Sequence, residues 1–403
     1  MSKPGMHVLL GVSLMLLLGG CDSSAGEVQR TPTTPAATSQ PASPTPTALA
    51  DIQHGSDLLP GPPPTYDAAP RPDTHTTSAA KLLGTGVVNW PVAAGPYLFW
   101  VEKRGSDQAI YGYDVAAQAQ FIITSALRPD AGYGLLTDGQ TLLWAESIIT
   151  DENANPLYNI YGYDLTAHRP ISLTVAPGAR TNAYNLAFDN GTLFYADNTP
   201  SHYGLYAQDI FSGQERLISR CGGGPMAAEG TLAWGEPVDG CSGQAYSNSS
   251  GNSSCCLAPI KTALHLLKLD GSKEDTVLTS SYGNIRYAVS GDRIVWSIYS
   301  VEQPVDDEGV YLYDIGSGNR QRILSQAGYD PLVDGNKVVW NNQPTEQSPA
   351  WTVTSYDIGT SVTSLAVKES VNWTEGRAIA APNKLVYTMT PLSGESKAYL
   401  ISL

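Results

Sequence analysis

Residues 329–340 read YDPLVDGNKVVW, and residues 351–366 read WTVTSYDIGTSVTSLA. Short apolar runs alternate here with turn signals such as Asp-Gly-Asn and Ile-Gly-Thr, and no run shows helical periodicity. This pattern predicts four short antiparallel strands joined by turns. The same pattern recurs in RYAVSGDRIVW and GVYLYDIGSGNRQRIL (286–296 and 309–324), and in LLTDGQTLLW and NIYGYDLTAHRPISLT (135–144 and 159–174).

Two markers count the repeats. An aromatic residue closes the second strand of each unit, at Trp100, Trp144, Tyr195, Trp234, Trp296, Trp340 and Tyr387. An aspartate closes the third strand, at Asp114, Asp164, Asp209, Asp270, Asp314 and Asp357. The aromatic markers lie 39 to 62 residues apart, which gives seven units.

Four-stranded units repeated at this period predict an all-β fold, a seven-bladed β-propeller of four-stranded antiparallel blades. Radial closure protects strand edges that an open array would expose. The seventh unit ends at its third strand, KAYLISL (397–403), while SAAKLLGTG (78–86) precedes the first unit and resembles a fourth strand. We therefore expect the N-terminal strand to complete the last blade; six blades is the alternative count.

The repeated apolar-Trp strand and Tyr-x-Tyr-Asp strand resemble the TolB-type propeller repeat across essentially all of residues 80–403. More distantly they resemble tryptophan–aspartate repeats. The resemblance implies the propeller fold, although six blades are common in the TolB type and seven are counted here. It implies little about function, because such propellers serve many roles.

The N-terminus is typical of a bacterial lipoprotein signal peptide, which we assign to residues 1–20. Lys3 and His7 precede an apolar run, Val8–Leu18, which is too short to span a bilayer. The run ends in Leu18-Gly19-Gly20-Cys21, which resembles a lipobox. By this resemblance Cys21 becomes the mature N-terminus and carries the lipid, so that acyl chains such as palmitate anchor the exported protein to the cell membrane. We expect it to face the periplasm or the cell exterior.

Residues 21–78 form the predicted stalk. They include TPTTPAATSQPASPTPT (31–47) and PGPPPTYDAAPRPD (60–73), which are too poor in apolar residues to fold. The folded part is therefore expected over 79–403.

The net charge of −15 argues against partners with phosphate backbones, and no nucleic-acid role is expected. We expect a monomer whose partners are the membrane, through the lipid, and a protein or glycan.

Loop lengths predict which face of the propeller binds. Turns between the first and second strands and between the third and fourth are tight, whereas second-to-third connections are long, as in 146–159, 235–262 and 297–309. Those long loops lie on the same face as the links between blades, and we call it the top face.

The candidate ligand-binding residues lie at the start of the innermost strands or one position earlier. They are Trp90, Tyr133, Tyr184, Asn185, Arg286, Tyr329, Asp330 and Arg377. Arg286, Asp330 and Arg377 fall on adjacent blades and either pair or grip an anionic or sugar ligand. The tyrosines either stack on a glycan or peptide, or pack between blades.

Acidic residues recur two positions after the marker, at Glu102, Glu146, Asp197 and Glu236. They either attract a cation or basic partner, or accept hydrogen bonds from the backbone of a neighbouring blade; we favour the second. The aspartates that close third strands are expected to fix the following turn with their side chains.

Four cysteines besides Cys21 cluster in or next to the fourth unit: Cys221, Cys241, Cys255 and Cys256. In an exported protein they predict two disulfides with three possible pairings. Zinc is a weaker alternative, because the spacing lacks paired C-x-x-C motifs.

No catalytic motif stands out. His168, His202 and His265 fall in three different units, and neither a G-x-S-x-G elbow nor a glycine-rich phosphate loop is present. We therefore predict a non-catalytic binding or scaffold module without metal or cofactor. The alternative is a carbohydrate-active lyase or hydrolase that uses carboxylates on the top face.

Overall fold

The computed structural model describes residues 80–87, 91–125, 127, 133–148, 157–174, 186–197, 203–238, 262–280, 285–299, 307–342, 351–370, 377–380, 383–389 and 395–403. All of them belong to one compact unit of the chain, Pro64–Leu403. The predicted signal peptide, Cys21 and stalk lie outside the described residues. Within the described ranges no helix has the length and apolar character needed to cross a membrane.

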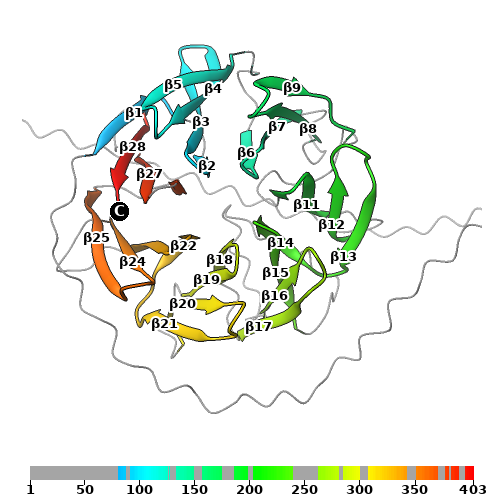
Figure 1. The fold of residues 1–403 in the computed structure, drawn as a ribbon, viewed down its shortest axis with the longest axis vertical. Coiled ribbons are helices and arrows are strands. Elements are labelled where there is room, and N and C mark those ends of the chain that lie inside the picture. The colour runs from blue at the N-terminus through cyan, green and yellow to red at the C-terminus, as the bar shows by residue number, and fades with distance from the viewer. Residues whose placement is uncertain are drawn as a thin grey trace, which may run out of the picture. The chain divides into compact units, whose positions relative to one another are not determined.

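Seven four-stranded antiparallel sheets form a ring (Figure 1), which confirms the seven-bladed propeller. The first three blades are β2 (Val92–Ala94), β3 (Tyr97–Arg104), β4 (Asp107–Asp114), β5 (Ala119–Thr124); β6 (Tyr133–Thr137), β7 (Thr141–Ile148), β8 (Leu157–Asp164), β9 (Arg169–Ile171); and β10 (Leu186–Asp189), β11 (Thr192–Asp197), β12 (Gly204–Asp209), β13 (Glu215–Ser219).

Blades four to seven continue the order around the ring. They are β14 (Gly223–Ala228), β15 (Thr231–Pro237), β16 (Thr262–Lys268), β17 (Glu274–Ser280); β18 (Ile285–Ser290), β19 (Arg293–Ile298), β20 (Gly309–Asp314), β21 (Arg320–Leu324); β22 (Tyr329–Asp334), β23 (Lys337–Asn342), β24 (Trp351–Asp357), β25 (Val362–Ser370); and β26 (Arg377–Ala380), β27 (Lys384–Met389), β28 (Lys397–Ser402), β1 (Lys81–Thr85).

The aromatic markers all lie on the second strand of their blade, and six of them stack on the residue directly opposite on the third strand. Trp296, for example, stacks on Tyr311 with ring centroids 5.4 Å apart and planes 9° apart. The other stacked pairs are Trp100–Tyr111, Trp144–Tyr161, Tyr195–Tyr206, Trp234–His265 and Tyr387–Tyr399. In the sixth blade Trp340 instead lies opposite Thr354. The marker therefore acts as a cross-strand packing unit, with a partner one strand further out.

The hydrophobic core lies between blades. Val295 and Val310 of the fifth blade form one cluster with Val338, Trp340 and Tyr356 of the sixth. Trp100, Trp296 and Trp340 are fully buried. Burial of a side chain of this size contributes on the order of 4–6 kcal/mol as an upper estimate. Packing of adjacent blade faces is therefore the main source of stability.

The third-strand aspartates fix the turns that follow, as predicted. Asp314 Oδ1 accepts the backbone N–H of Ser317 at 2.8 Å, and Asp357 Oδ1 accepts that of Thr360 at 2.8 Å. Asp114, Asp164, Asp209 and Asp270 accept equivalent bonds. Hydrogen bonds to Lys337 and Thr360 lower the pKa of Asp357 to about 2, because they favour the charged carboxylate.

The N-terminal strand closes the ring, as predicted. β1 pairs antiparallel with β28, with Lys81 opposite Leu400 and Thr85 opposite Lys397. Lys81 also reaches the first blade, where its Nζ donates to Tyr113 Oη at 2.7 Å. β1 thus belongs to the last blade, which is joined to the first by the Lys81 side chain and by the backbone bond from Lys103 N–H to the carbonyl of Gly86, just after β1.

A buried glycine lies at this closure. Gly84 lies at an irregularity in the β1–β28 register, against the first blade. An added Cβ would lie 2.5 Å from Glu102 Oε2 and 2.9 Å from Trp100 Nε1. Those two atoms belong to one buried hydrogen-bonded pair, so neither side chain has room to move away.

We predict that Gly84→Ala destabilises the propeller by about 1–3 kcal/mol, through overpacking at the closure. Chemical denaturation of the full chain measures this effect. The control is Gly359→Ala, which adds the same methyl group in a turn where the nearest heavy atom would be 3.5 Å away. Equal unfolding midpoints for the two variants would contradict the proposed role of Gly84.

Candidate functional site

The rim between the fifth and sixth blades brings together three of the predicted site residues. Arg286 lies on β18, while Tyr329 and Asp330 begin β22. The guanidinium Nε of Arg286 lies 3.6 Å from Asp330 Oδ1, and the two side chains are 40% and 36% exposed. The two neighbouring blades therefore present a positive and a negative group side by side at the start of their innermost strands.

Two aromatic residues that the sequence did not single out complete this group. Tyr299 follows β19, and its ring centroid lies 4.6 Å from that of Tyr329. Trp351 begins β24 and meets Tyr329 edge to face at 5.7 Å. We call Arg286, Tyr299, Tyr329, Asp330 and Trp351 the rim cluster.

Tyr329 is the buried centre of the rim cluster. It is 5% exposed, so it packs between Tyr299 and Trp351 and does not offer an open face for stacking. Burial, together with the nearby Glu308 carboxylate, raises the pKa of Tyr329 to about 12. The residues around it, by contrast, are half-exposed.

Arg286 is fixed from two sides. Burial acts to lower its pKa, but the interactions with Tyr299, which include a side-chain hydrogen bond, and the attraction of Asp330 outweigh burial and raise that pKa. The residue directly opposite on β19 is Ser297, which is fully buried. Its Oγ has no hydrogen-bond partner among the described residues.

The backbone at Asp330 is unusual. Its φ is 46°, in the left-handed region, and the β22–β23 register shifts between Tyr329 and Leu332. The equivalent position in the fourth blade is Gly224, with φ 61°, also at a register shift. Glycine adopts this conformation without strain, whereas aspartate tolerates it at some cost. A strained bulge that directs a side chain into a rim is typical of functional sites.

The remaining predicted residues are not placed by the structure. Trp90, Tyr184 and Asn185 lie outside the described residues, as does His202, and only the backbone is described for Tyr133 and Arg377. Whether the predicted residues bind a ligand stays a prediction.

Three of the four acidic residues after the marker accept a hydrogen bond from a donor other than the backbone of a neighbouring blade. Trp100 Nε1 donates to Glu102 at 3.3 Å, and the indoles of Trp144 and Trp234 donate likewise to Glu146 and Glu236. In the sixth blade Asn342 takes the same role for Trp340 at 2.9 Å. Residues two apart share one face of a strand, so the acid satisfies the buried indole of its own strand.

The fifth blade lacks this acceptor. Ile298 stands two residues after Trp296, and the buried Nε1 of Trp296 has no partner among the described residues. Asp197 follows a tyrosine, Tyr195, whose hydroxyl donates to Glu215.

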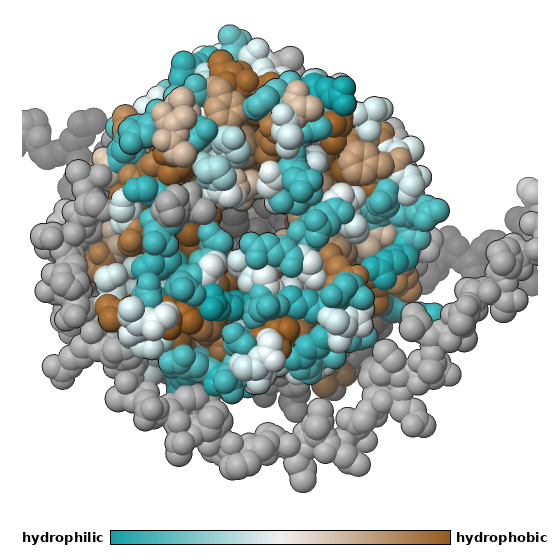
Figure 2. Space-filling view, viewed as in Figure 1, coloured by the Kyte–Doolittle hydropathy of each residue, from teal (hydrophilic) through white to brown (hydrophobic). Residues whose placement is uncertain are grey.

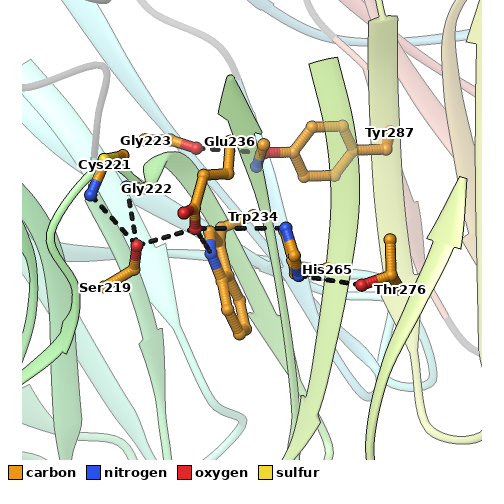
Figure 3. A network of polar contacts seen from close by, with 10 residues as sticks. Ser219, Cys221, Gly222, Gly223, Trp234, Glu236, His265, Thr276 and Tyr287 are labelled. Carbon is orange, nitrogen blue, oxygen red and sulfur yellow. Dashed lines mark hydrogen bonds and ion pairs between the residues drawn. The ribbon is translucent and has the colours of Figure 1, made fainter. Parts of the chain in front are cut away.

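A second polar group joins the end of the third blade to the fourth blade (Figure 3). Ser219 Oγ accepts from the backbone N–H of Cys221 and Gly222, and donates to Glu236 Oε2 at 2.7 Å. His265 stacks on Trp234, lies 4.0 Å from Glu236 through Nε2 and meets Thr276 Oγ1 through Nδ1 at 3.2 Å. Ser219 Oγ therefore takes part in three hydrogen bonds, and Glu236 also accepts from the indole of Trp234.

Cys221 lies at the edge of this group. The three other clustered cysteines, Cys241, Cys255 and Cys256, fall outside the described residues. Their pairing into two disulfides stays a prediction.

Carboxylates at the opposite face join blades to one another. Asp189 accepts the backbone N–H of Glu229 at 3.0 Å and of Gly230 at 2.7 Å, across the third and fourth blades. Burial raises the pKa of Asp189, Glu229 and Asp334. Among the described residues no cluster of three or more His, Cys, Asp or Glu is arranged to hold a metal ion.

We predict that Asp330→Ala destabilises the protein by about 1 kcal/mol more than Asp330→Gly, because only glycine adopts the left-handed bulge without strain. Both variants lose the carboxylate, so the difference isolates the backbone term. Thermal and chemical denaturation give the two stabilities. Equal stabilities would mean that residue 330 is not left-handed in solution.

Comparisons with known proteins support the fold. No protein-family model matches the sequence, and no curated protein matches it either. The β-propeller domain of the Trilobed protease from Pyrococcus furiosus is similar in structure, with 12% identity, a TM-score of 0.52, and coverage of 80% of this chain and 96% of that one. That domain is described as having an open velcro topology, whereas here β1 closes the last blade.

Two further solved structures were also found to be similar. A prolyl endopeptidase structure matches with 9% identity and a TM-score of 0.54, over 79% of this chain and 47% of that one. TolB from Acinetobacter baumannii matches with 15% identity and a TM-score of 0.42, over 76% and 80%. At these identities the likeness shows a β-propeller fold and does not settle whether the chain is an enzyme.

Proposed function

We propose that this chain is an exported, lipid-anchored recognition protein whose propeller binds a protein or glycan partner at the rim cluster and carries out no catalysis. The observation that carries the proposal is the juxtaposition of Arg286, Asp330 and the half-exposed aromatics Tyr299 and Trp351. Binding sites typically combine an apolar surface with a few placed polar groups.

The chemistry of the surrounding side chains favours recognition. The third-strand aspartates, the acids after the marker and Ser219 hold turns and indoles in place, so each has a role in the fold. The rim cluster differs, because its charged pair is half-exposed and one member, Asp330, lies on a strained bulge. A lyase or hydrolase would need an acid and a base directed at one reacting bond.

The described surface also favours a small, polar site over a broad apolar one. Its large exposed hydrophobic residues, such as Ile122, Phe211 and Val362, are spread over several blades. Figure 2 shows hydrophobic residues as separate islands among hydrophilic ones around the central opening of the ring.

Export and anchoring rest on the sequence. The apolar run Val8–Leu18 followed by Leu-Gly-Gly-Cys supports lipidation of Cys21, and the Pro- and Thr-rich segment supports a long tether. At about 3.1 Å per residue, such a segment could extend to more than roughly 100 Å between the bilayer and the propeller.

We expect Cys21→Ser to abolish incorporation of labelled palmitate and to move the full chain from the membrane fraction to the soluble fraction. The physical reason is that the thiol of residue 21 is the predicted attachment atom. Cys221→Ser serves as the matched control and should keep the label. A Cys21→Ser protein that is still labelled would overturn the anchor.

We expect the full chain, purified in detergent, to capture a component from a bacterial envelope extract, with at least about tenfold weaker capture by Asp330→Asn through the loss of a charged hydrogen-bond acceptor. The control is Asp334→Asn, which removes a carboxylate from the opposite end of the same strand. Circular dichroism and denaturation verify both folds. Equal weakening by the two variants, or no capture by the wild type, would contradict recognition at the rim cluster.

A further inference from the structure

We infer that the rim cluster binds a neutral saccharide through a pair of adjacent hydroxyl groups. The inference rests on the proposed function and narrows it, since it names the ligand chemistry of that same site. Four properties of the cluster lead to it: the donor–acceptor pair, its rigidity, its aromatic surface and its charge.

The donor–acceptor pair comes first. Arg286 presents a planar fork of N–H donors, and Asp330 presents carboxylate acceptors 3.6 Å away. That separation exceeds the usual hydrogen-bond length, so the two groups attract one another without a short direct bond. A hydroxyl is both donor and acceptor, so it can accept from the guanidinium and donate to the carboxylate at the same time. Two neighbouring sugar hydroxyls match this pair better than a ligand that only accepts or only donates.

The pair is held before any ligand arrives. Asp330 is directed by a left-handed bulge, and Arg286 is hydrogen-bonded to Tyr299. Because these side chains are already ordered, less conformational entropy is lost on binding. Ser297, directly opposite Arg286 on β19, is fully buried, and its Oγ has no hydrogen-bond partner among the described residues.

The aromatic surface suits the apolar side of a sugar ring. Tyr299 and Trp351 are half-buried on either side of the buried Tyr329. The C–H groups on the face of a pyranose carry partial positive charge, and an aromatic face is negative, so the two attract. Aromatic residues beside a donor–acceptor pair therefore match both surfaces of a saccharide.

The charge around the cluster favours a neutral ligand. The chain carries a net charge of −15, and Asp330 and Glu308 both lie near Tyr329, which disfavours an anionic ligand. Arg286, whose positive charge faces the same rim, disfavours a cationic one. A neutral polyhydroxy ligand experiences neither repulsion.

The test uses the full chain in detergent and three neutral hexasaccharides whose sugars each carry adjacent hydroxyls as probes: mannohexaose, maltohexaose and xylohexaose. Chitohexaose, whose internal sugars carry an acetamido group at C2 and have no adjacent hydroxyl pair, is the matched control and should not bind. Calorimetry and tryptophan fluorescence report binding. We expect at least one probe to bind, with Arg286→Lys and Trp351→Ala each weakening binding roughly tenfold or more. Asp334→Asn should bind as the wild type does, and Trp351→Phe gives a milder change in case Trp351→Ala fails to fold.

The role of adjacent hydroxyls is tested on the ligand side. Periodate cleaves vicinal diols, so the bound probe after periodate oxidation and borohydride reduction should lose its affinity, while polygalacturonate and a mixed peptide library should not compete. Undiminished binding of the oxidised probe, or binding that survives both Arg286→Lys and Trp351→Ala, would overturn the inference.

The inference and the proposed function fail in different ways. If no hexasaccharide binds but envelope capture still depends on Asp330, the rim cluster recognises another ligand and only the saccharide inference falls. If capture is also absent, the recognition function itself falls.

Discussion

The cross-strand stack between the marker and its third-strand partner is the interaction on which the structure depends. It fixes the register of the second and third strands, as for Trp296 and Tyr311, and places a large ring on the face of the sheet that packs against the neighbouring blade. An indole buried in this way needs an acceptor for its N–H, which four of the blades supply from the same strand two residues later. Stacking, register and polar satisfaction are therefore provided together by the marker, its third-strand partner and the acceptor two residues after the marker.

The two ends of the blades are used differently. At the end formed by the tight turns, carboxylates such as Asp189 accept hydrogen bonds from backbone N–H groups of the next blade and so stabilise the ring. At the other end the innermost strands begin after variable links, and the fifth and sixth blades place charged and aromatic side chains there. Asp330 keeps a side chain at a position where Gly224 of the fourth blade has none, and it accepts backbone strain to do so. Stability alone would favour glycine at both positions.

Most of the fold could be predicted from the sequence, because the same pattern of strands and turns repeats in each blade. The seven markers, the turn aspartates and the closing strand Lys81–Thr85 all lie where the repeat places them.

The site was predicted only in part. Arg286 and Asp330 followed from the alignment of units, but Tyr299 and Trp351 flank long connections that share no register with other blades. A bulge changes which side chains of a strand are buried, and sequence spacing does not reveal where a bulge occurs. The burial of Tyr329 and the left-handed backbone of Asp330 are therefore known only from the structure. The predicted backbone donor to Glu102 was wrong, because Trp100, two residues earlier, shares its face of the strand and donates its indole N–H instead.

The pairing of β1 with β28 sets the order in which the protein can mature. Lys81 is made early and Leu400 late, yet the two lie opposite each other in the same sheet. A nascent chain can build the first six blades one after another from contacts that are local in sequence, but the contact of highest sequence separation must wait for the last strand. Until then the face of the first blade that packs against the last blade, which includes Trp100 and Tyr111, stays uncovered. Ring closure is therefore both the slowest expected folding step and the period in which an unfinished molecule is most exposed to aggregation.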